Sequence, residues 1–276
     1  MEKMLEGKVA IITGSGRGIG QATAKMLARE GAKVVVCDID AAPANETVKE
    51  IIAGGGTAIV SVGSVSDKNY PDQLVDLTLK KFGNLHIIVN NAGVTWDAMI
   101  HKMSDEQWYA IIDIHLTGPF RILRAAGNFI REEAKKEIAE GKRVMRKVVN
   151  VMSVAGTMGN PGQVNYASAK AGHVGMIKTL AKEWGSFNVN CNAIAFGFIE
   201  TRMTDEKEKG ETATVTAGEK VAIGMPKKVR EMFINNIPLR RGASPEEAAR
   251  GIFFLVSPLS DYVTGHVLKL DGGLDM

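Results

Sequence analysis

Cysteine is scarce in this chain of 276 residues, which contains only Cys37 and Cys191. Both lie in apolar, strand-like runs and neither belongs to a CxxC pair or a Cys/His cluster, so we expect buried free thiols and no metal site. Long hydrophobic runs are also lacking, since none approaches the ~18 residues that a membrane span needs. The segment from Met1 to Lys8 is charged and lacks the apolar core of a secretion signal. These absences favour a reduced, cytoplasmic location.

An excess of charge of either sign is missing as well. The formal net charge is only +3, and basic and acidic residues are interleaved, so nucleic acid is not an expected partner. The composition, 45% hydrophobic and 24% charged, is that of an ordinary soluble domain. No linker, repeat or low-complexity segment divides the chain, and we expect a single domain over residues 1–276.

Short apolar runs alternate with longer amphipathic stretches along the whole chain. Most of the short runs are apolar at consecutive positions, as in strands that are covered on both faces. The alternation predicts an α/β fold, a single Rossmann-type doubly wound parallel sheet with helices on both faces. The expected strands are Val9–Thr13, Lys33–Cys37, Ala58–Val62, Ile87–Asn90, Val148–Met152, Asn190–Ile194 and His266–Leu270, and the expected helices are Ile19–Arg29, Pro43–Ile52, Tyr70–Phe82, Asp105–Arg131, Val164–Trp184 and Pro245–Ser257.

Two connections are too long to be simple turns. Residues 131–147 are rich in Lys, Arg and Glu, and we expect an exposed helical extension there. Residues 204–236 follow the carboxyl end of the sixth strand, which is where ligands of such sheets bind. Long loops in compact domains are mostly functional or disordered. We therefore expect a substrate lid in this second segment.

A glycine-rich loop, Thr13-Gly14-Ser15-Gly16-Arg17-Gly18-Ile19-Gly20, directly follows the first strand. Its glycines are spaced Gly14-x-x-x-Gly18-x-Gly20, which differs from the literal GxGxxG pattern. Glycines let the backbone turn tightly and approach a pyrophosphate, while the next helix offers its N-terminal amides. A structural turn would explain one or two of these glycines, but four between a strand and a helix predict a dinucleotide-binding loop.

Asp38 and Arg17 favour different cofactors. Asp38 ends the second strand, close to the ~20-residue offset expected of a ribose-binding acid, where its carboxylate would bind the hydroxyls of NAD and repel the extra phosphate of NADP. Arg17 could instead meet that phosphate. Because Asp38 would face the 2′-position directly whereas Arg17 can swing into solvent, we predict NAD, with NADP as the alternative. The simpler structural explanation of Asp38 is a helix cap or turn residue.

Tyr166 and Lys170 stand four residues apart, so that a helix would project a phenol and an ammonium from one face. The pKa of a free tyrosine, about 10, is too high for a ready general base at neutral pH. A cation beside it favours the phenolate, so we expect Lys170 to lower the pKa of Tyr166. The pair alone is a weak signal, because two fixed residues recur by chance in many chains.

Taken together, these motifs resemble the single-domain short-chain dehydrogenase/reductase family over nearly the whole chain. The resemblance implies a seven-stranded sheet ordered 3-2-1-4-5-6-7 and an NAD(P)-dependent oxidoreductase that interconverts a secondary alcohol and a ketone. Within the family, Gly159–Tyr166 and Gly197–Thr201 are most similar to 3-oxoacyl-(acyl-carrier-protein) reductases and 3-hydroxyacyl-CoA dehydrogenases, which implies a 3-oxoacyl or 3-hydroxyacyl thioester as substrate. The motifs that carry the resemblance are Thr13–Gly20, Asn90-Asn91-Ala92-Gly93, Ser153, Tyr166-x-x-x-Lys170, Gly197 with Thr201, and Asp271-Gly272-Gly273.

The resemblance also implies roles for individual residues. Tyr166 would donate a proton to the substrate carbonyl oxygen during reduction, and Ser153 would hydrogen-bond the same oxygen. Lys170 would tune Tyr166 and contact the nicotinamide ribose, and Thr201 would reach the carboxamide. The residues implied at the cofactor are Gly14, Ser15, Arg17, Gly18, Ile19, Gly20, Asp38, Ile39, Ser64, Val65, Asn91, Ala92, Gly93, Tyr166, Lys170, Gly197, Ile199 and Thr201.

Three positions depart from the pattern of the family. His115 stands where an Asn usually steers a proton-relay water; it is kept as a candidate catalytic residue, the alternative being a packed helix residue without that function. Ser64 stands where an Asp usually lies beside the adenine. Phe196 replaces the usual Pro before Gly197, which changes the rigidity of this loop without removing the Thr201 contact.

The substrate side is less specific. The candidates are mostly apolar, and a stripe of Met and aromatic residues more often belongs to an ordinary core. Carrier-protein reductases place arginines beside the site entrance, a role open here to Arg143, Arg146 and Lys147, but Phe187 stands where many have a second arginine. An acyl-CoA substrate therefore competes with a carrier-bound one. The candidate substrate-binding residues are Ser153, Val154, Met158, Gln163, Phe198 and Met203, with Trp96 at the rim.

Two other functions stay open. One is a dehydrogenase of another secondary alcohol, such as a steroid, polyol or cyclic alcohol. The other is a non-catalytic nucleotide-binding scaffold or sensor, against which the intact Ser153, Tyr166 and Lys170 argue. By resemblance, a homotetramer or homodimer is expected through the helices Asp105–Arg131 and Val164–Trp184 and the last strand.

Overall fold

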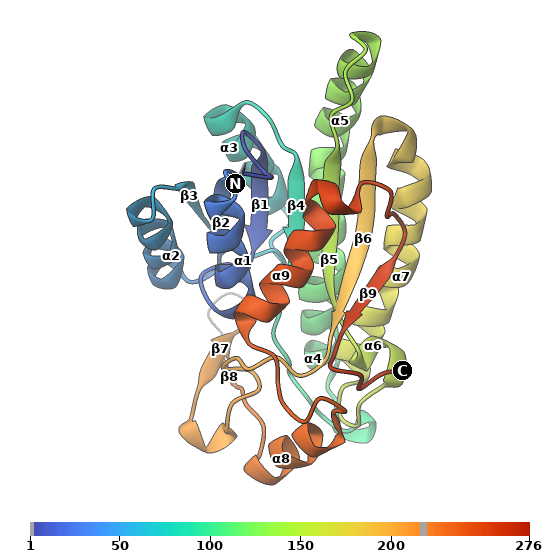
Figure 1. Cartoon of the computed structure of the whole chain (residues 1–276). Coiled ribbons are helices and arrows are strands. Elements are labelled where there is room, and N and C mark those ends of the chain that lie inside the picture. Colours follow the sequence, from blue (N-terminus) through green and yellow to red (C-terminus); the bar gives the residue numbers. More distant parts are fainter. Residues whose placement is uncertain (1–2, 216–219) are drawn as a thin grey trace.

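A computed structural model describes residues 3–215 and 220–276 of the chain (Figure 1). Its centre is a seven-stranded parallel sheet ordered β3-β2-β1-β4-β5-β6-β9. The predicted order 3-2-1-4-5-6-7 is confirmed, with β9 as the seventh strand of the sheet. The strands are β1 (Val9–Thr13), β2 (Lys33–Asp38), β3 (Thr57–Val62), β4 (Ile87–Asn90), β5 (Arg146–Ser153), β6 (Val189–Phe196) and β9 (Val267–Leu270).

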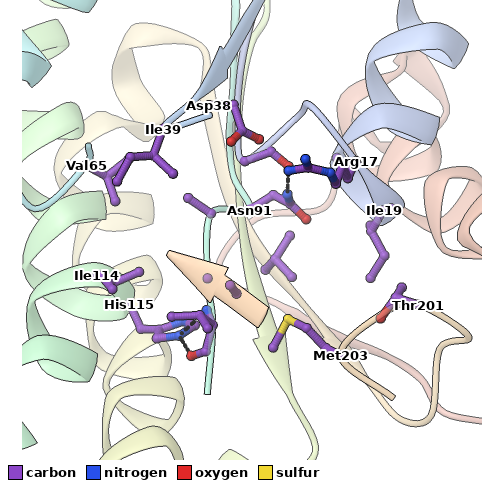
Figure 2. Close-up of a pocket in the computed structure, with 18 of the residues that line it drawn as sticks. Arg17, Ile19, Asp38, Ile39, Val65, Asn91, Ile114, His115, Thr201 and Met203 are labelled. Carbon is purple, nitrogen blue, oxygen red and sulfur yellow. Dashed lines mark hydrogen bonds between the residues drawn. The ribbon is translucent and has the colours of Figure 1, made fainter. Parts of the chain in front are cut away.

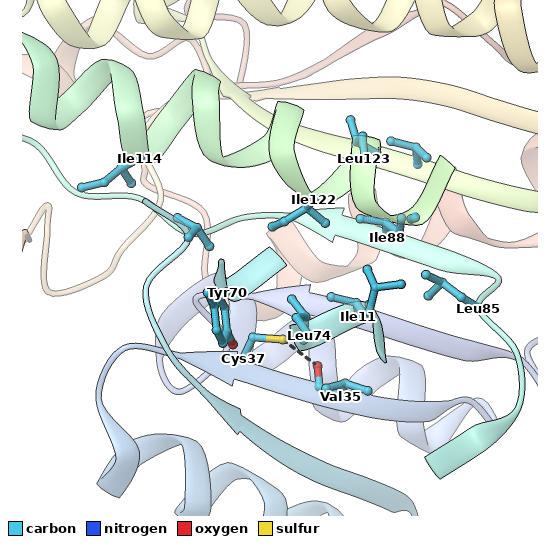
Figure 3. Close-up of a cluster of buried hydrophobic side chains, with 14 of the residues drawn as sticks. Ile11, Val35, Cys37, Tyr70, Leu74, Leu85, Ile88, Ile114, Ile122 and Leu123 are labelled. Carbon is cyan, nitrogen blue, oxygen red and sulfur yellow. Dashed lines mark hydrogen bonds between the residues drawn. The ribbon is translucent and has the colours of Figure 1, made fainter. Parts of the chain in front are cut away.

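Helices cover both faces of the sheet, which explains why the central strands are apolar at consecutive positions. Every residue of β1, β4 and β6 is buried. On one face, Leu74 and Ile122 from the helices pack with Ile11 and Ile88 from the strands (Figure 3). This face carries α3 (Tyr70–Phe82), α4 (Asp105–Ile112), α5 (Gly118–Ala139) and α7 (Val164–Trp184), and the other carries α1 (Gly18–Arg29), α2 (Ala41–Ala53) and α9 (Pro245–Val256).

The helix expected over Asp105–Arg131 is two helices joined by a π-helical turn. A capping box of Ser104 and Gln107 starts α4, and the π-helical turn spans Asp113–Thr117. The next helix, α5, begins at Gly118 and continues to Ala139, projecting beyond the sheet (Figure 1). The first part of the extension expected at 131–147 is therefore the end of α5. The hydrophobic period does not break at the π turn, so the sequence did not reveal it.

The expected lid segment, 204–236, folds as a short antiparallel hairpin followed by a helix. The hairpin pairs β7 (Thr212–Thr214) with β8 (Lys220–Ala222), and α8 (Lys227–Asn236) follows. Residues 216–219 of this segment lie outside the described residues. Figure 1 places the hairpin and α8 at the edge of the sheet where the strands end. The remaining short elements are α6 (Ala155–Met158) and the 3₁₀ turns Ile100–Lys102, Gly185–Phe187, Lys207–Lys209 and Pro258–Ser260.

A buried ion pair anchors α5 to the amino end of β5. Arg146 is 1% exposed, and its Nη1 and Nη2 donate to the two carboxylate oxygens of Glu137 at 2.6 and 2.9 Å. The next residue, Lys147, is also buried and donates to Asp261 at 2.7 Å. Seven residue steps separate Arg146 from Ser153, about 23 Å along a strand. The prediction that Arg146 and Lys147 stand at the site entrance is therefore wrong, because they occupy the opposite edge of the sheet.

Within residues 3–215 and 220–276, every helix is too short or too polar to cross a membrane.

Replacing Glu137 by Ala is expected to lower the free energy of unfolding by about 3–5 kcal/mol, because it leaves a buried guanidinium without its carboxylate. Urea denaturation would measure the loss. Glu132→Ala is the matched control, since Glu132 lies on the same helix and pairs with Lys135 in solvent. Equal losses in the two variants would contradict the role given to the buried pair.

Candidate active site

The carboxyl ends of the strands border a cleft of about 490 Å³ (Figure 2). The strand order reverses between β1 and β4, and doubly wound sheets bind their ligands in the crevice at such a point. All residues predicted to hold the cofactor line this cleft except Ser15. Ser15 is fully buried and its Oγ donates to the carbonyl of Ile12 at 2.7 Å, so it braces the glycine loop from behind.

Two glycines of the loop are required by close packing. Gly14 has a φ of 61°, and a Cβ there would lie 2.7 Å from the Cα of Ala92. A Cβ on Gly20 would lie 2.2 Å from the carbonyl oxygen of Gly14. The bare backbone thus forms a concave wall next to the N-terminus of α1, which fits the pyrophosphate of a dinucleotide.

The ends of β1 and β4 are held together by Thr13 and Asn91. Thr13 Oγ1 accepts hydrogen bonds from the backbone amides of Asn91 and Ala92, each at 3.0 Å. In return, Asn91 Nδ2 donates to the carbonyls of Thr13 and Gly14 at 2.9 and 3.0 Å. The Asn91 amide thus braces the wall of the cleft between β1 and β4.

Two carboxylates and one guanidinium lie at the end of β2. Asp38 accepts hydrogen bonds from the amides of Gly16 and Asp40 at 2.9 and 3.0 Å. Asp40, which the sequence analysis did not single out, pairs with Arg17 at 2.8 Å. Arg17 is exposed, as expected, and it pairs with the Asp40 carboxylate at the surface. Asp38 makes the contacts of a turn residue, which was its alternative explanation, and it also lines the cleft, where the prediction of ribose binding requires it.

Ser153 and Tyr166 come together at the floor of the cleft. Ser153 ends β5, and Tyr166 lies in the first turn of α7. Burial raises the pKa of Tyr166 to about 12, against a smaller lowering by the hydrogen bond with the Ser153 hydroxyl. The expected lowering of this pKa by Lys170 does not occur, because burial raises the pKa and Lys170 makes no resolved contribution to it. Tyr166 holds its proton at neutral pH.

The amine of Lys170 is buried and donates a hydrogen bond to the backbone. It is 3% exposed, its Nζ donates to the carbonyl of Val151 at 2.6 Å, and Nζ lies 5.5 Å from the ring centroid of Tyr166. Burial lowers the pKa of Lys170 to about 7. The amine and the phenol do share one helical face, as their spacing predicted.

His115 lies in the π-helical turn with its ring edge against Tyr166, at a centroid distance of 4.9 Å. Its Nε2 is 2.7 Å from the carbonyl oxygen of Val94. A Cβ on Gly93 would come within 2.3 Å of the imidazole, so this glycine makes room for the ring. Burial, together with the positive charge of Lys170, holds the pKa of His115 well below its usual range. The ring is neutral.

A row of buried polar side chains behind Lys170 was missed by the sequence analysis. Asn90 Nδ2 donates to Asn150 Oδ1 at 2.8 Å, and Asn150 Nδ2 lies 3.0 Å from His173 Nδ1. Burial lowers the pKa of His173 to about 3. The spacing of His173, three residues after Lys170 on α7, was the signal that placed both on one face.

The predicted substrate residues divide into two groups. Ser153 and Met203 line the cleft, whereas Val154, Met158, Gln163 and Phe198 do not. Gln163 is engaged elsewhere, since its Nε2 donates to Asp97 at 2.9 Å. Phe198 is buried beneath the guanidinium of Arg230 at 5.5 Å, and Met158 is exposed at the surface; the predicted rim residue Trp96 packs against the core.

The segment expected to form a lid contributes residues to the cleft that the sequence did not identify. They come from β7 and the residue after it and from the loop after β6, and in Figure 2 β7 is the pale orange arrow across the cleft. Arg202 of this loop pairs with Glu211, which precedes β7, at 3.2 Å. The cleft residues from the lid and its loop are Arg202, Thr204, Ala213, Thr214 and Val215.

Among the described residues, no group of His, Cys, Asp or Glu side chains could hold a metal ion. Cys37 and Cys191 are buried free thiols, as expected.

Comparison with known proteins adds two findings. A family profile described as "Enoyl-(Acyl carrier protein) reductase" matches residues 14–275. Among curated proteins, a 3-oxoacyl-(acyl-carrier-protein) reductase of Thermotoga maritima is 40% identical over 270 residues, covering 98% of each chain. One from Synechocystis is 40% identical and covers 99% of this chain and 98% of its own length. A third, from Aquifex aeolicus, is 35% identical and covers 99% of this chain and all of its own.

Replacing Lys170 by Met is expected to stabilise the fold. The folded pKa of about 7 lies below the ~10.4 of an unfolded lysine, so the cost of burying the ammonium is fully present below pH 7 and fades toward pH 10. Thermal unfolding should show a higher midpoint for the variant, by about 2–4 °C for each kcal/mol gained, and the gain should be largest at pH 6.

Lys178→Met is the matched control, because Lys178 is exposed on the same helix. A midpoint for Lys170→Met below that of the parent protein would contradict the burial cost.

Proposed function

We propose, on the premise that this chain belongs to the short-chain dehydrogenase/reductase family of NAD(P)-dependent oxidoreductases, that it reduces the 3-oxo group of an acyl thioester. The profile match and the full-length relatives support the premise. The observation that carries the proposal is the meeting of Ser153, Tyr166 and Lys170 beside the cleft that the glycine loop borders.

The side chains suit proton donation to a carbonyl oxygen. NADH supplies the hydride when bound. Ser153 and Tyr166 both line the cleft, and the Ser153 hydroxyl lowers the pKa of Tyr166, which fits two hydroxyls that serve one carbonyl oxygen. Since burial keeps Tyr166 protonated, it can give its proton to the oxygen as negative charge develops there. Lys170, while protonated, stabilises the resulting phenolate.

NAD is the cofactor we propose, with NADP as the alternative. The cleft volume of about 490 Å³ lies within the usual range of cofactor sites. The bare backbone of the glycine loop fits a pyrophosphate. Asp38 places a carboxylate at the end of β2, where it favours ribose hydroxyls over a phosphate. Val65 also lines the cleft, where it is buried and offers an apolar face to an adenine.

For the substrate, we favour a 3-oxoacyl group carried on acyl carrier protein or on CoA. The names of the three relatives describe reduction of a 3-oxoacyl carrier-protein thioester. The name of the family profile describes a different reaction, reduction of a carbon–carbon double bond. A pair of hydroxyl donors next to the hydride source fits a carbonyl oxygen better, because an enoyl double bond has no oxygen at the carbon that accepts hydride.

His115 is proposed as a positioning residue. Its ring packs nearly perpendicular to that of Tyr166, and its bond to Val94 fixes the ring in a buried place. Through Nδ1 it can steer a water of the proton relay.

Assembly and location are proposals by family. Exposed aromatic side chains on α4 and α5, Tyr109 and Phe120, support a homotetramer or homodimer through these helices. We propose a cytoplasmic location, like that expected from the sequence.

A steady-state panel of NADH and NADPH against acetoacetyl-CoA, a pantetheine carrier mimic, crotonyl-CoA and simple ketones tests the function. We expect the highest kcat/KM for the 3-oxo thioesters with NADH. Tyr166→Phe should lower kcat by about 10²–10⁴ with little change in the dissociation constant of NADH. Faster reduction of crotonyl-CoA would favour the enoyl reaction, and cofactor binding without any turnover would favour a scaffold.

His115→Ala is expected to lower kcat at least about tenfold and to change the pH profile of kcat, because the ring no longer supports Tyr166 or a relay water. His115→Asn should recover part of the rate, since an amide can make the bond to Val94. An unchanged rate and pH profile in His115→Ala would remove His115 from the mechanism.

A further inference from the structure

The carboxylate of Asp40 joins the lid to the nucleotide end of the cleft. Its Oδ2 lies 2.8 Å from Arg17 Nη1, and its Oδ1 accepts a hydrogen bond from Thr214 Oγ1 at 3.3 Å. Its own backbone amide donates to Asp38 Oδ1 at 3.0 Å. One side chain thus ties together the glycine loop, the segment after β2 and strand β7, which are far apart in the sequence.

Strand β7 forms part of the wall at this end of the cleft. Thr214 and Val215 line the cleft together with Arg17, Asp38 and Val65. Val215 is only 2% exposed and belongs to the same apolar cluster as Val65. The lid expected to cover the substrate therefore also reaches the nucleotide end.

The local charge disfavours a phosphate. Two carboxylates, Asp38 and Asp40, stand against the single guanidinium of Arg17, and that guanidinium is already paired. A phosphomonoester carries about −1.5 to −2 charges at neutral pH. A 2′-phosphate that took Arg17 Nη1 would break the pair with Asp40 and would bring its own negative charge next to that carboxylate.

We propose that Asp40 is a latch that determines cofactor specificity. Its carboxylate keeps Arg17 from binding a 2′-phosphate, and it holds Thr214 of the lid over the nucleotide. NADH leaves both contacts of Asp40 in place, whereas NADPH must break at least one. This proposal rests on the proposed function, but it needs only the binding of a nicotinamide cofactor and not the reaction.

Equilibrium binding of NADH and NADPH, followed by nicotinamide fluorescence, tests the latch without turnover. The parent protein should bind NADH more tightly. Asp40→Asn should raise the affinity for NADPH about tenfold, because it releases a guanidinium for a charge-assisted hydrogen bond, with a smaller change for NADH. Asp40 is the residue before α2 and makes no side-chain cap bond there, so Asn is a mild replacement.

The decisive comparison is a double-mutant cycle with Arg17→Ala. If Asp40 acts by holding Arg17, Asp40→Asn in the Arg17→Ala background should give no gain for NADPH. A gain of the same size there would overturn the latch, since it would show a general effect of charge. Asp72→Asn, which removes an exposed carboxylate on α3 away from the cleft, is the control for net charge and should change neither affinity.

The lid contact is tested by Thr214→Val, which should speed the release of NADH in stopped-flow measurements. Unchanged release would overturn this half of the proposal. NADPH binding at least as tight as NADH in the parent protein would overturn the latch and leave the reductase function standing. Binding of neither cofactor would overturn both, whereas binding without reduction of a 3-oxo thioester would overturn only the reaction.

Discussion

Thr13 and Asn91 hold the ends of β1 and β4 together through four hydrogen bonds, and the rest of the site is built outward from them. These hydrogen bonds bring Ala92 so close to Gly14 that only glycine fits at position 14. One residue further on, Gly93 lies against the ring of His115, whose edge meets Tyr166. Direct contacts therefore run from the glycine loop to the phenol, so hydride source and proton donor are placed by the same backbone.

The polar groups at this centre are arranged for chemistry at the expense of stability. Burial holds the pKa of Lys170 at about 7, of His173 at about 3 and of His115 well below its usual range, so the two imidazoles next to the amine are neutral. Because the two rings are neutral, they add no second positive charge that would repel the ammonium of Lys170. Asn150 and Val94 fix the two rings by hydrogen bonds, and the amine itself is held by the carbonyl of Val151.

Much of the fold was predictable because strands buried on both faces show as consecutive apolar residues, and β1, β4, α3 and α7 were predicted with their observed bounds. The glycine loop and the Tyr166 and Lys170 pair followed from spacing, whereas Ser153 came from the resemblance to the family. The predictions that failed concerned features that depend on tertiary contacts. Arg146 looked like a surface cation, but Glu137 lies opposite it. Three-residue strands such as β7 carry too few side chains to show a period, so the lid's reach to Asp40 was not visible. The pKa of Tyr166 depends on burial, which a motif does not encode.

The π-helical turn at Asp113–Thr117 also bears on how this segment can change in evolution. A π turn contains one more residue than the α-helical turn it replaces. Deleting a residue there would convert the π turn into an α-helical turn and leave the buried face of α5, including Ile122 and Ile130, against the sheet. The extra residue therefore changes the local placement of His115 against Tyr166 and not the packing of α5, so this turn can gain or lose a residue while the sheet stays covered.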